Sequence, residues 1–386
     1  MQLIMNILDI ASTLAHIPLL SRLKKGLVFR PDEFPDCFGM RVQLNAKRVP
    51  ERTAIIFEGK TFTWFEFNAL ANRYAHYGIS IGLKRGDAVS VMMENRTEFL
   101  ALLVGFNKIG VISSLLNTNL TGESLAHCVV VSKSLKIIFG SEVEPSVREL
   151  RGQLTLNQER DFLVVPDGSN NDGTDWAVNL SAGATSASSI DPEDSLCTVI
   201  GETALFIFTS GTTGLPKAAV LSNRRFLTAA AMSSMAGLKC TEKDRLYLCL
   251  PLYHGTGVMV GMGASWTSGA SIFLRRKFSA SHFLQEVRDN GCNCFVYVGE
   301  ICRYLMNTES LKTDGDNPLR AMIGNGLRPD VWLDFKRRFK VKRIMEFYGA
   351  SEGNVFFGNL MNKDCTVGMT TNEVVLVDYD IKEDEI

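Results

Sequence analysis

The chain has 386 residues, of which 46% are hydrophobic and 22% charged, and its formal net charge at pH 7 is -1. These values are typical of a globular protein that is long enough for two or more subdomains with cores of their own. A net charge so close to zero argues against nucleic acid as a partner, because proteins that bind nucleic acid normally present a basic face.

The nine cysteines favour a reduced, intracellular protein. They are scattered without the paired spacing of a zinc site or a disulfide framework. Cys292 and Cys294 lie one residue apart in an apolar run, as neighbours on one face of a strand do. We therefore expect core thiols and an intracellular location, either cytoplasmic or peripherally attached to a membrane.

No stretch of the sequence predicts a clear transmembrane helix. Residues 246–274 contain no Asp, Glu, Lys or Arg, but Pro251, His254 and several glycines interrupt them. Such a stretch favours a buried strand and helix over a membrane span.

Residues 1–48 are expected to form an N-terminal segment ahead of the main domain, which covers 49–386. Apolar residues recur there at helical spacing and a basic cluster follows: Leu3, Ile7, Ile10, Leu14 and Ile17, then Arg22, Lys24 and Lys25. An amphipathic helix of this kind can rest on a membrane surface or dock on the protein's own body, and both remain open. Because no basic residue precedes the apolar part, a secretory signal is disfavoured.

The first part of the main domain predicts a parallel sheet. A hairpin over 54–64 leads into a helix over 66–78, and Asn95 is expected to cap a helix over 96–109. The remaining elements are strands at 88–93, 111–116 and 136–139 and a helix at 123–132. This alternation is typical of a parallel sheet with right-handed crossovers. Residues 167–194, rich in Gly, Ser, Asn and Asp, predict an exposed and mobile connection.

A second α/β region follows after residue 245. Its expected strands are 246–250, 270–274, 293–298, 319–323 and 343–347, and its expected helices are 255–267, 279–290, 300–306 and 329–339. Pro329 and Asp330 suit the first turn of the last helix, and basic residues suit its end. The fold class is therefore α/β with two doubly wound β-α-β subdomains, whose ligands bind beyond the carboxyl ends of the strands.

Residues 206–220 predict a strand, a loop rich in small hydroxyl residues, and a second strand. Glycines let backbone N–H groups turn toward one point, hydroxyls add donors, and a lysine adds a cation suited to polyphosphate. The candidate phosphate-binding residues are Thr209, Ser210, Gly211, Thr212, Thr213, Gly214 and Lys217. The spacing differs from that of a Walker P-loop, which opens a helix. For a loop considered alone, a solvated Ser/Thr/Gly hairpin is the alternative.

A second candidate segment, 348–352, follows the strand predicted at 343–347. Tyr348 can stack on a purine, and Gly349 and Ser351 can approach or donate to a phosphate. Glu352 can hold a magnesium ion that bridges phosphates. Considered alone, the segment is a polar turn.

Two further motifs follow other predicted strands. Gly324, Asn325 and Gly326 offer a flat backbone edge and one amide, which suits the lining of an adenine pocket; the alternative is a simple glycine turn. His254 lies between a strand and a helix, where it can gate an acyl tunnel or touch a reacting carboxylate. A lone histidine is more often a satisfied core residue.

Together these motifs resemble those of the adenylate-forming superfamily, which contains acyl-CoA synthetases, luciferases and nonribosomal adenylation domains. The resemblance runs from about Val49 to the end and is closest to the fatty-acid-transport-protein or very-long-chain acyl-CoA synthetase branch. The strings that carry it are EGKTFTW, RGDAVSVMMENRTEF, TSGTTGLPK, PLYHGTG, GNGLRPDVW and FYGASEGN.

The resemblance implies the large N-terminal domain of such an enzyme, with the start of a β-barrel-like subdomain at the C-terminus. It implies that ATP and Mg²⁺ bind at 209–217 with Glu352 on the metal. A fatty carboxylate then attacks the α-phosphate and expels pyrophosphate, and the thiol of coenzyme A displaces AMP to give a thioester. Thr209, Lys217, His254 and Glu352 are the residues for which the resemblance implies catalytic roles.

The sequence departs from the family at its C-terminus, because members continue into a hinge and a small mobile domain. Residues 374–386 resemble an opened hairpin without its partner strand, so we expect a fragment of a longer reading frame. The alternatives are a non-catalytic protein for fatty-acid uptake or binding, and a CoA ligase for a bile, aryl or amino acid. Peripheral membrane contact and a homodimer stay open.

Overall fold

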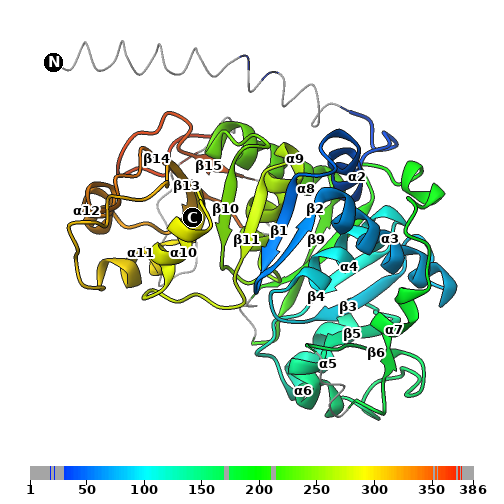
Figure 1. Cartoon of the computed structure of the whole chain (residues 1–386). Helices are drawn as coiled ribbons and strands as arrows, with labels where there is room; N and C mark the ends of the chain where they lie inside the picture. The colour runs from blue at the N-terminus through cyan, green and yellow to red at the C-terminus, as the bar shows by residue number, and fades with distance from the viewer. Residues whose placement is uncertain are drawn as a thin grey trace.

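The structure is a computed structural model of the chain that describes residues 30–168, 174–209, 214–350 and 355–370, together with 18, 21, 353, 373 and 375. The described residues form two sheets, one of seven and one of eight strands. In Figure 1 the seven-stranded sheet (cyan to green) lies to the lower right, β10 to β14 lie to the left, and β1 and β2 (blue) lie between them.

The seven-stranded sheet has the order β7-β6-β5-β3-β4-β8-β9. Its strands are β3 (Ala88–Met92), β4 (Ile112–Leu115), β5 (Lys136–Gly140), β6 (Phe162–Val165), β7 (Val178–Asn179), β8 (Thr203–Thr209) and β9 (Lys217–Ser222). Neighbouring strands are parallel except β8 and β9, which form an antiparallel hairpin. Its connecting helices include α4 (Thr97–Lys108), α5 (Gly122–Val131) and α6 (Glu144–Arg148).

The eight-stranded sheet has the order β15-β14-β13-β12-β10-β11-β1-β2. Its strands are β1 (Thr53–Phe57), β2 (Lys60–Thr63), β10 (Arg245–Leu248), β11 (Ser271–Leu274), β12 (Cys294–Val298), β13 (Ala321–Asn325), β14 (Arg343–Tyr348) and β15 (Phe357–Gly358). The middle strands are parallel, and β2 and β15 are antiparallel to their neighbours. The helices α10 (Phe283–Asp289), α11 (Gly299–Met306) and α12 (Pro329–Phe339) connect its second half. The predicted doubly wound α/β fold is confirmed.

A shared layer of helices joins the two sheets into one hydrophobic core. The layer contains α2 (Phe38–Arg48), α3 (Trp64–Ser80), α4, α8 (Asn223–Ala231) and α9 (Gly263–Ser268). Phe38 is fully buried, with its ring 4.5 Å from that of Phe226 and 5.3 Å from that of Trp266. Because burial of apolar surface dominates folding, this aromatic group fixes α2 against α8 and α9.

Helix α12 begins and ends as the sequence predicts, with proline in its first turn and basic residues in its last. The helix predicted at 255–267 begins instead as a π-helical stretch, Thr256–Met262, before it continues as α9. A second π-helical stretch, Met232–Leu238, follows α8. Gly257 is required in the first stretch, because a Cβ there would lie 2.3 Å from the carbonyl oxygen of Pro251.

The prediction that Asn95 caps helix α4 is wrong. The N-cap residue is Arg96, and its side chain makes no capping hydrogen bond. The Asn95 amide instead donates to the carbonyl oxygens of Leu250 at 2.8 Å and Arg275 at 3.0 Å, and its oxygen accepts from the N–H of Leu252 at 2.9 Å. Because its side chain makes these long-range hydrogen bonds, Asn95 does not cap the helix, although its residue type suits an N-cap.

The prediction of an exposed connection over 167–194 is wrong for residues 178–185. Residues 178–179 form β7 at the edge of the sheet, and α7 (Leu180–Thr185) follows, with Leu180 fully buried. The chain beyond α7 runs along α3, where Asp191 forms an ion pair at 3.0 Å with the buried Lys108. A few apolar side chains and one buried cation therefore fix a segment whose composition suggests a loop. Residues 169–173 lie outside the described residues.

The nine cysteines are free, but Cys197 and Cys365 are exposed, so the expectation of core thiols fails for these two. Cys292 and Cys294 are both buried, although β12 begins only at Cys294. None of the helices in the described part of the chain is long and apolar enough to span a membrane.

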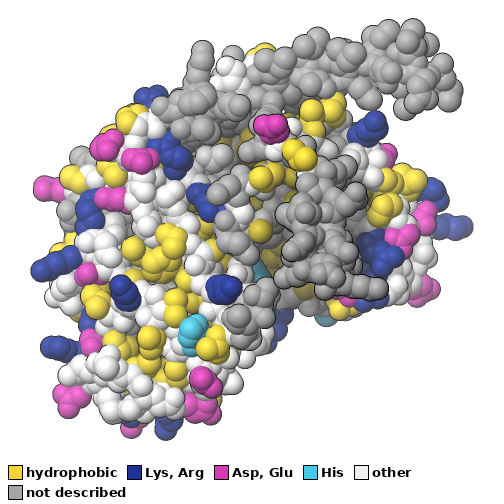
Figure 2. Space-filling model, turned by 180° about the vertical axis from the view of Figure 1, so that it is seen from behind, with side chains coloured by type: hydrophobic (Ala, Val, Ile, Leu, Met, Phe, Trp, Pro, Cys, Tyr) yellow, Lys and Arg dark blue, Asp and Glu magenta, His cyan; other side chains and the backbone are white. Residues whose placement is uncertain are grey.

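The far face of the molecule carries charged side chains of both signs mixed along its rim, with hydrophobic side chains nearer its middle (Figure 2). The predicted barrel-like subdomain falls mostly on residues 371–386, of which the structure describes 373 and 375.

Candidate functional site

The β8–β9 hairpin carries the loop that the sequence predicts to bind phosphate. Thr209 ends β8 and lies opposite Lys217, the first residue of β9. Gly214 has φ +96°, a conformation that favours glycine, and Lys217 is exposed. The strands therefore bring a hydroxyl and an ammonium group to the two ends of one loop. Residues 210–213, which include Ser210, Gly211, Thr212 and Thr213, lie outside the described residues.

The predicted adenine-lining residues lie at the carboxyl end of β13. Gly324 and Asn325 are its last residues, and Gly326 follows with φ +82°. The hydroxyl of Thr256 lies 3.4 Å from the side-chain oxygen of Asn325. This contact brings the turn that contains His254 against the end of β13.

The predicted stacking residue Tyr348 ends the adjacent strand β14 and is 63% exposed. Its ring meets the ring of Phe357 edge-on with centroids 6.1 Å apart, and Gly349 beyond it is also exposed. One face of this tyrosine is therefore free to meet a planar group. Ser351 and Glu352 lie outside the described residues.

His254 lies in the turn after β10, exposed, with its ring 5.3 Å from that of Tyr253. The backbone N–H of His254 donates to the carbonyl oxygen of Pro251 at 3.1 Å, and its backbone carbonyl accepts from the N–H of Val258 at 3.0 Å. Desolvation by its surroundings lowers the pKa of the imidazole below its ordinary value. The neutral ring, which can both donate and accept, is therefore favoured at neutral pH.

Three of the four predicted motifs thus meet at one edge of the eight-stranded sheet, while the hairpin belongs to the other sheet. Helix α8, which begins directly after β9, reaches toward the same edge, because Arg225 donates a hydrogen bond to the carbonyl oxygen of Gly353. Helix α8 starts at the end of the hairpin opposite the loop, because Ser222 before it pairs with Thr203 while Lys217 pairs with Thr209. The candidate residues of both sheets nevertheless follow carboxyl ends of parallel strands, as expected of ligand sites in doubly wound folds.

Sequence reasoning missed Glu346, a buried carboxylate on β14. It is 3% exposed, and it accepts hydrogen bonds from the hydroxyl of Tyr297 and from the N–H of Leu327 at 3.1 Å. Burial raises the pKa of this carboxyl group, although its hydrogen bonds oppose the effect. A glutamate inside an apolar strand was the available signal, because such a residue is rarely buried without partners.

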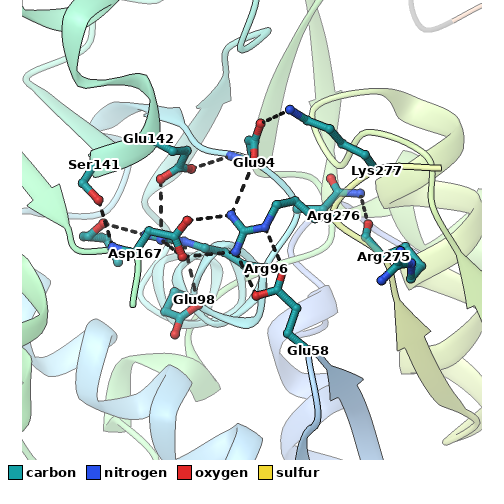
Figure 3. A network of polar contacts seen from close by, with 12 residues as sticks. Glu58, Glu94, Arg96, Glu98, Ser141, Glu142, Asp167, Arg275, Arg276 and Lys277 are labelled. Carbon is teal, nitrogen blue, oxygen red and sulfur yellow. Dashed lines mark hydrogen bonds and ion pairs between the residues drawn. The ribbon is translucent and has the colours of Figure 1, made fainter. Parts of the chain in front are cut away.

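An ionic network lies where other strands of both sheets end (Figure 3). Arg276, which follows β11, contacts Asp167 at 2.7 Å, Glu58 at 2.8 Å and Glu94 at 3.4 Å. Arg96, 1% exposed, lies 3.3 Å from Asp167 and donates at 2.6 Å to the carbonyl oxygen of Val165. The network joins the ends of β1 and β11 to those of β3 and β6, so it ties the two sheets together.

Two acids of this network respond to it in opposite directions. Burial alone would raise the pKa of Asp167, but hydrogen bonds and charge from Arg276 and Arg96 outweigh it and hold the pKa below its ordinary value. For Glu142, burial outweighs the attraction of Arg96 and raises the pKa.

A cavity of about 440 Å³ lies elsewhere, between α2 and α9. It is lined by Arg41, Leu44, Asn45, Lys47, Arg48, Trp266 and Thr267, and none of the predicted site residues is among them. Within the described ranges, no group of three or more His, Cys, Asp or Glu side chains could hold a metal ion.

Curated relatives of this chain include fatty-acid ligases and transport proteins. The chain is 36% identical over 384 residues to the medium/long-chain-fatty-acid–CoA ligase FadD6 of Mycobacterium tuberculosis, which covers 97% of this chain and 62% of that protein. It is 37% identical over 325 residues to long-chain fatty acid transport protein 1 of Bos taurus, which covers 83% of this chain and 50% of that protein. The chain therefore spans less than two thirds of the length of these relatives.

Solved structures with the same fold include the inhibitor-bound N-terminal domain of FACL13 from Mycobacterium tuberculosis. Its TM-score is 0.72 at 21% identity, over 87% of this chain and 82% of that chain. The anthranilate CoA ligase AuaEII in complex with anthranoyl-AMP gives a TM-score of 0.77 at 18% identity, over 92% of this chain and 68% of that chain. At these identities the likeness establishes the fold.

The family match covers most of the sequence and agrees with the arrangement of strand-end motifs on two parallel-rich sheets. Because residues 42–385 match the family described as AMP-binding enzyme, the chain belongs to that family.

Proposed function

We propose that this chain forms the nucleotide-binding part of an AMP-forming ligase that activates a long- or very-long-chain fatty acid. ATP and the fatty acid would give an acyl-adenylate and pyrophosphate, and coenzyme A would then give the acyl thioester and AMP. The observation that carries the proposal is membership of the AMP-binding enzyme family over residues 42–385. The substrate class follows the names of the relatives, which are fatty-acid ligases and fatty-acid transport proteins.

In this proposal the β8–β9 hairpin holds the triphosphate. The paired positions of Thr209 and Lys217 support this role, because a hydroxyl donor and a cation then face one loop from its two ends. Lys217 would neutralise charge that builds on the departing pyrophosphate. Tyr348 would stack on the base, and Gly324, Asn325 and Gly326 would line its edge.

The first step requires positioning more than proton transfer, because the attacking carboxylate is already ionised at neutral pH. No protein nucleophile is needed. The exposed and predominantly neutral His254 would donate to the fatty carboxylate or close the acyl path near the end of β13. The apolar residues that recur at helical spacing over 3–17 would contact the membrane surface from which a long-chain acid is drawn.

The proposal includes Mg²⁺ with Glu352 as its ligand, since carboxylate oxygens are the ligands that this ion prefers. Bound there, the ion would supply positive charge that offsets the charge of the phosphates.

The test is titration of the 386-residue chain with ATP in a calorimeter, followed by exchange of labelled pyrophosphate into ATP with fatty acids of increasing length. We expect saturable ATP binding by this chain, and, in a protein extended to the full length of its relatives, exchange that requires Mg²⁺ and depends on chain length. Lys217→Ala should weaken exchange and Glu352→Ala should abolish it. A chain that binds no ATP would overturn the proposal. Exchange that benzoate or a bile acid supports and palmitate does not would overturn the substrate class.

A further inference from the structure

Tyr297, Gly324 and Glu346 lie in one row across three adjacent strands. Gly324 of β13 is in register with Tyr297 of β12 on one side and with Glu346 of β14 on the other. Residues in register on parallel strands point to the same face of a sheet. The tyrosine and the glutamate therefore flank the glycine on one face, and both are buried.

The hydroxyl of Tyr297 donates a hydrogen bond to Oε2 of Glu346 across the space above Gly324. A Cβ at position 324 would lie 2.0 Å from the carbonyl oxygen of Tyr297 and 2.7 Å from its Cγ. Only a residue without a side chain leaves this space open. Gly324 therefore has a packing reason that the sequence alone does not reveal.

The other carboxylate oxygen holds the turn that follows β13. Oε1 of Glu346 accepts from the N–H of Leu327 at 3.1 Å. The carbonyl of Gly326 packs against Gly299, where a Cβ would lie 1.7 Å from that oxygen. The turn is thus fixed by the amide hydrogen bond of Leu327 and by a close backbone contact.

Glu346 also lies beneath the exposed ring at the end of its own strand. Tyr348 is two residues further along β14 and so points to the same face, one pleat beyond Glu346. The tyrosine is 63% exposed and the glutamate 3% exposed. The turn that Glu346 holds and the ring above it are the two walls between which the proposed function puts a nucleotide base.

We propose that Glu346 is a positioning residue for the nucleotide, because its carboxylate fixes the main chain of the turn at Gly324–Gly326 beneath Tyr348. This inference rests on the proposed function. Glu346 is 3% exposed and its carboxylate accepts from Tyr297 and Leu327, so it acts through the turn and not by touching the base. A side chain that served stability alone would affect all ligands and the fold together, whereas a positioning residue affects the nucleotide selectively.

The test compares Glu346→Ala, Glu346→Gln and Tyr297→Phe with the 386-residue wild-type chain. Calorimetry gives the Kd for ATP and for palmitate, and hydrogen exchange gives the protection of the amide of Leu327. Glu346→Ala should raise the Kd for ATP about tenfold, the effect of one lost hydrogen-bonded contact, while the Kd for palmitate is unchanged. The amide of Leu327 should exchange faster. Glu51→Ala, which removes an exposed carboxylate ahead of β1, should change none of these values.

Glu346→Gln should restore ATP binding to within about threefold of wild type, because its amide oxygen still accepts from the turn and its NH₂ group can donate to Tyr297. Equal ATP affinity in wild type and Glu346→Ala would overturn the positioning role while leaving the proposed function intact. So would an equal loss of ATP and palmitate binding. Wild-type protein that binds no ATP would overturn both. If Glu346→Ala does not fold, Tyr297→Phe decides, with weaker ATP binding expected and unchanged binding contradicting the proposal.

Discussion

The ionic network of Figure 3 and the candidate nucleotide edge, which consists of Lys217, the turn at 324–326 and Tyr348, occupy equivalent places. Both follow the carboxyl ends of parallel strands. They differ in how their charges are matched. In the network, Arg96 is 1% exposed and lies within 4 Å of three carboxylates, those of Glu98, Glu142 and Asp167. At the nucleotide edge, Lys217 is exposed and forms no ion pair within the described part of the chain.

The comparison shows that a place beyond a strand end does not by itself mark a ligand site. In the ionic network of Figure 3, residues of opposite charge from the two sheets pair with one another and hold the sheets together. We call this network the joint. Where a cation of one sheet, Lys217, and an aromatic ring of the other, Tyr348, have no charged partners among the described residues, the strand ends can receive an anion and a planar base. The balance of charge between neighbours distinguishes the two uses.

The largest expected effect is a loss of stability when the joint is disrupted. Arg96→Ala should lower the free energy of unfolding by about 3 kcal/mol, because loss of this buried cation leaves the mostly buried carboxylate of Glu142 and the carbonyl oxygen of Val165 without their partner. Urea unfolding followed by tryptophan fluorescence measures the change. Folded Arg96→Ala protein should still bind ATP.

Arg303→Ala is the matched control for that experiment. Arg303 pairs with Glu300 on the surface of α11, where both side chains are about half exposed, at 47% and 51%. Exposed pairs contribute between about 0 and 1 kcal/mol, so this variant should unfold nearly as wild type does. Similar losses in the two variants would mean that burial of the network has no special importance.

Asn95→Ala should cost about 2 kcal/mol, because it leaves two carbonyls and one N–H without partners in a buried site. The lost bonds hold the start of the turn that carries His254, so fatty-acid-dependent exchange should fall more than ATP affinity does. Asn95→Asp keeps the shape but turns an oxygen toward the carbonyls of Leu250 and Arg275, and it should be at least as destabilising. Urea midpoints and exchange rates check both variants, and wild-type behaviour would contradict the bridging role.

At the nucleotide edge, Lys217→Ala should leave the urea midpoint unchanged and raise the Kd for ATP about thirtyfold, the value of one charged hydrogen bond near 2 kcal/mol. Lys217→Arg keeps the charge and should lose less. Lys312→Ala removes another exposed lysine and serves as the control. A large loss of stability in Lys217→Ala would place this lysine with the joint and not with the ligand site.

Local signals predicted much of the fold. Helix α12 begins at a proline and ends after a basic turn, and the β8–β9 hairpin follows a run of apolar residues on each side of a glycine-rich loop. Each depends on neighbours in sequence, so the sequence alone can reveal it. The four strand-end motifs could likewise be placed at the carboxyl edges, because doubly wound topology fixes which ends meet.

The missed features depend on partners that are distant in sequence. Asn95 has the right residue type for a helix cap, but its bonds reach residues 155 and 180 positions away. Glu346 could not be assigned without the register that aligns it with Tyr297, 49 positions away. Residues 178–185 are ordered by contacts with α3 and β6 that composition does not reveal. Long-range register decides these cases, and a single sequence does not contain it.

The smallest expected effect is a dependence of stability on pH, which arises from acids of the joint and not from the nucleotide edge. The folded state holds the pKa of Asp167 below its ordinary value of 3.8 through Arg276 and Arg96, against the effect of burial. Its contribution to stability is therefore complete above the unfolded pKa and is lost as the pH falls below that value. Glu142 acts in the opposite sense, because its raised pKa gives stability that is lost as the pH rises through the folded value.

Asp167→Asn removes the first contribution and also reduces the second, because the charge of Asp167 helps to raise the pKa of Glu142. The difference in urea midpoint between wild type and Asp167→Asn should be constant from pH 7 to about pH 5 and should shrink toward pH 3, as the carboxylate of wild type becomes protonated. The arginines that face Asp167 stay charged throughout this range, so the change reports the acids of the network and not its cations. A difference that stays constant to pH 3 would mean that Asp167 is not held in its ionised form by the network, and that the joint depends on packing and not on matched charge.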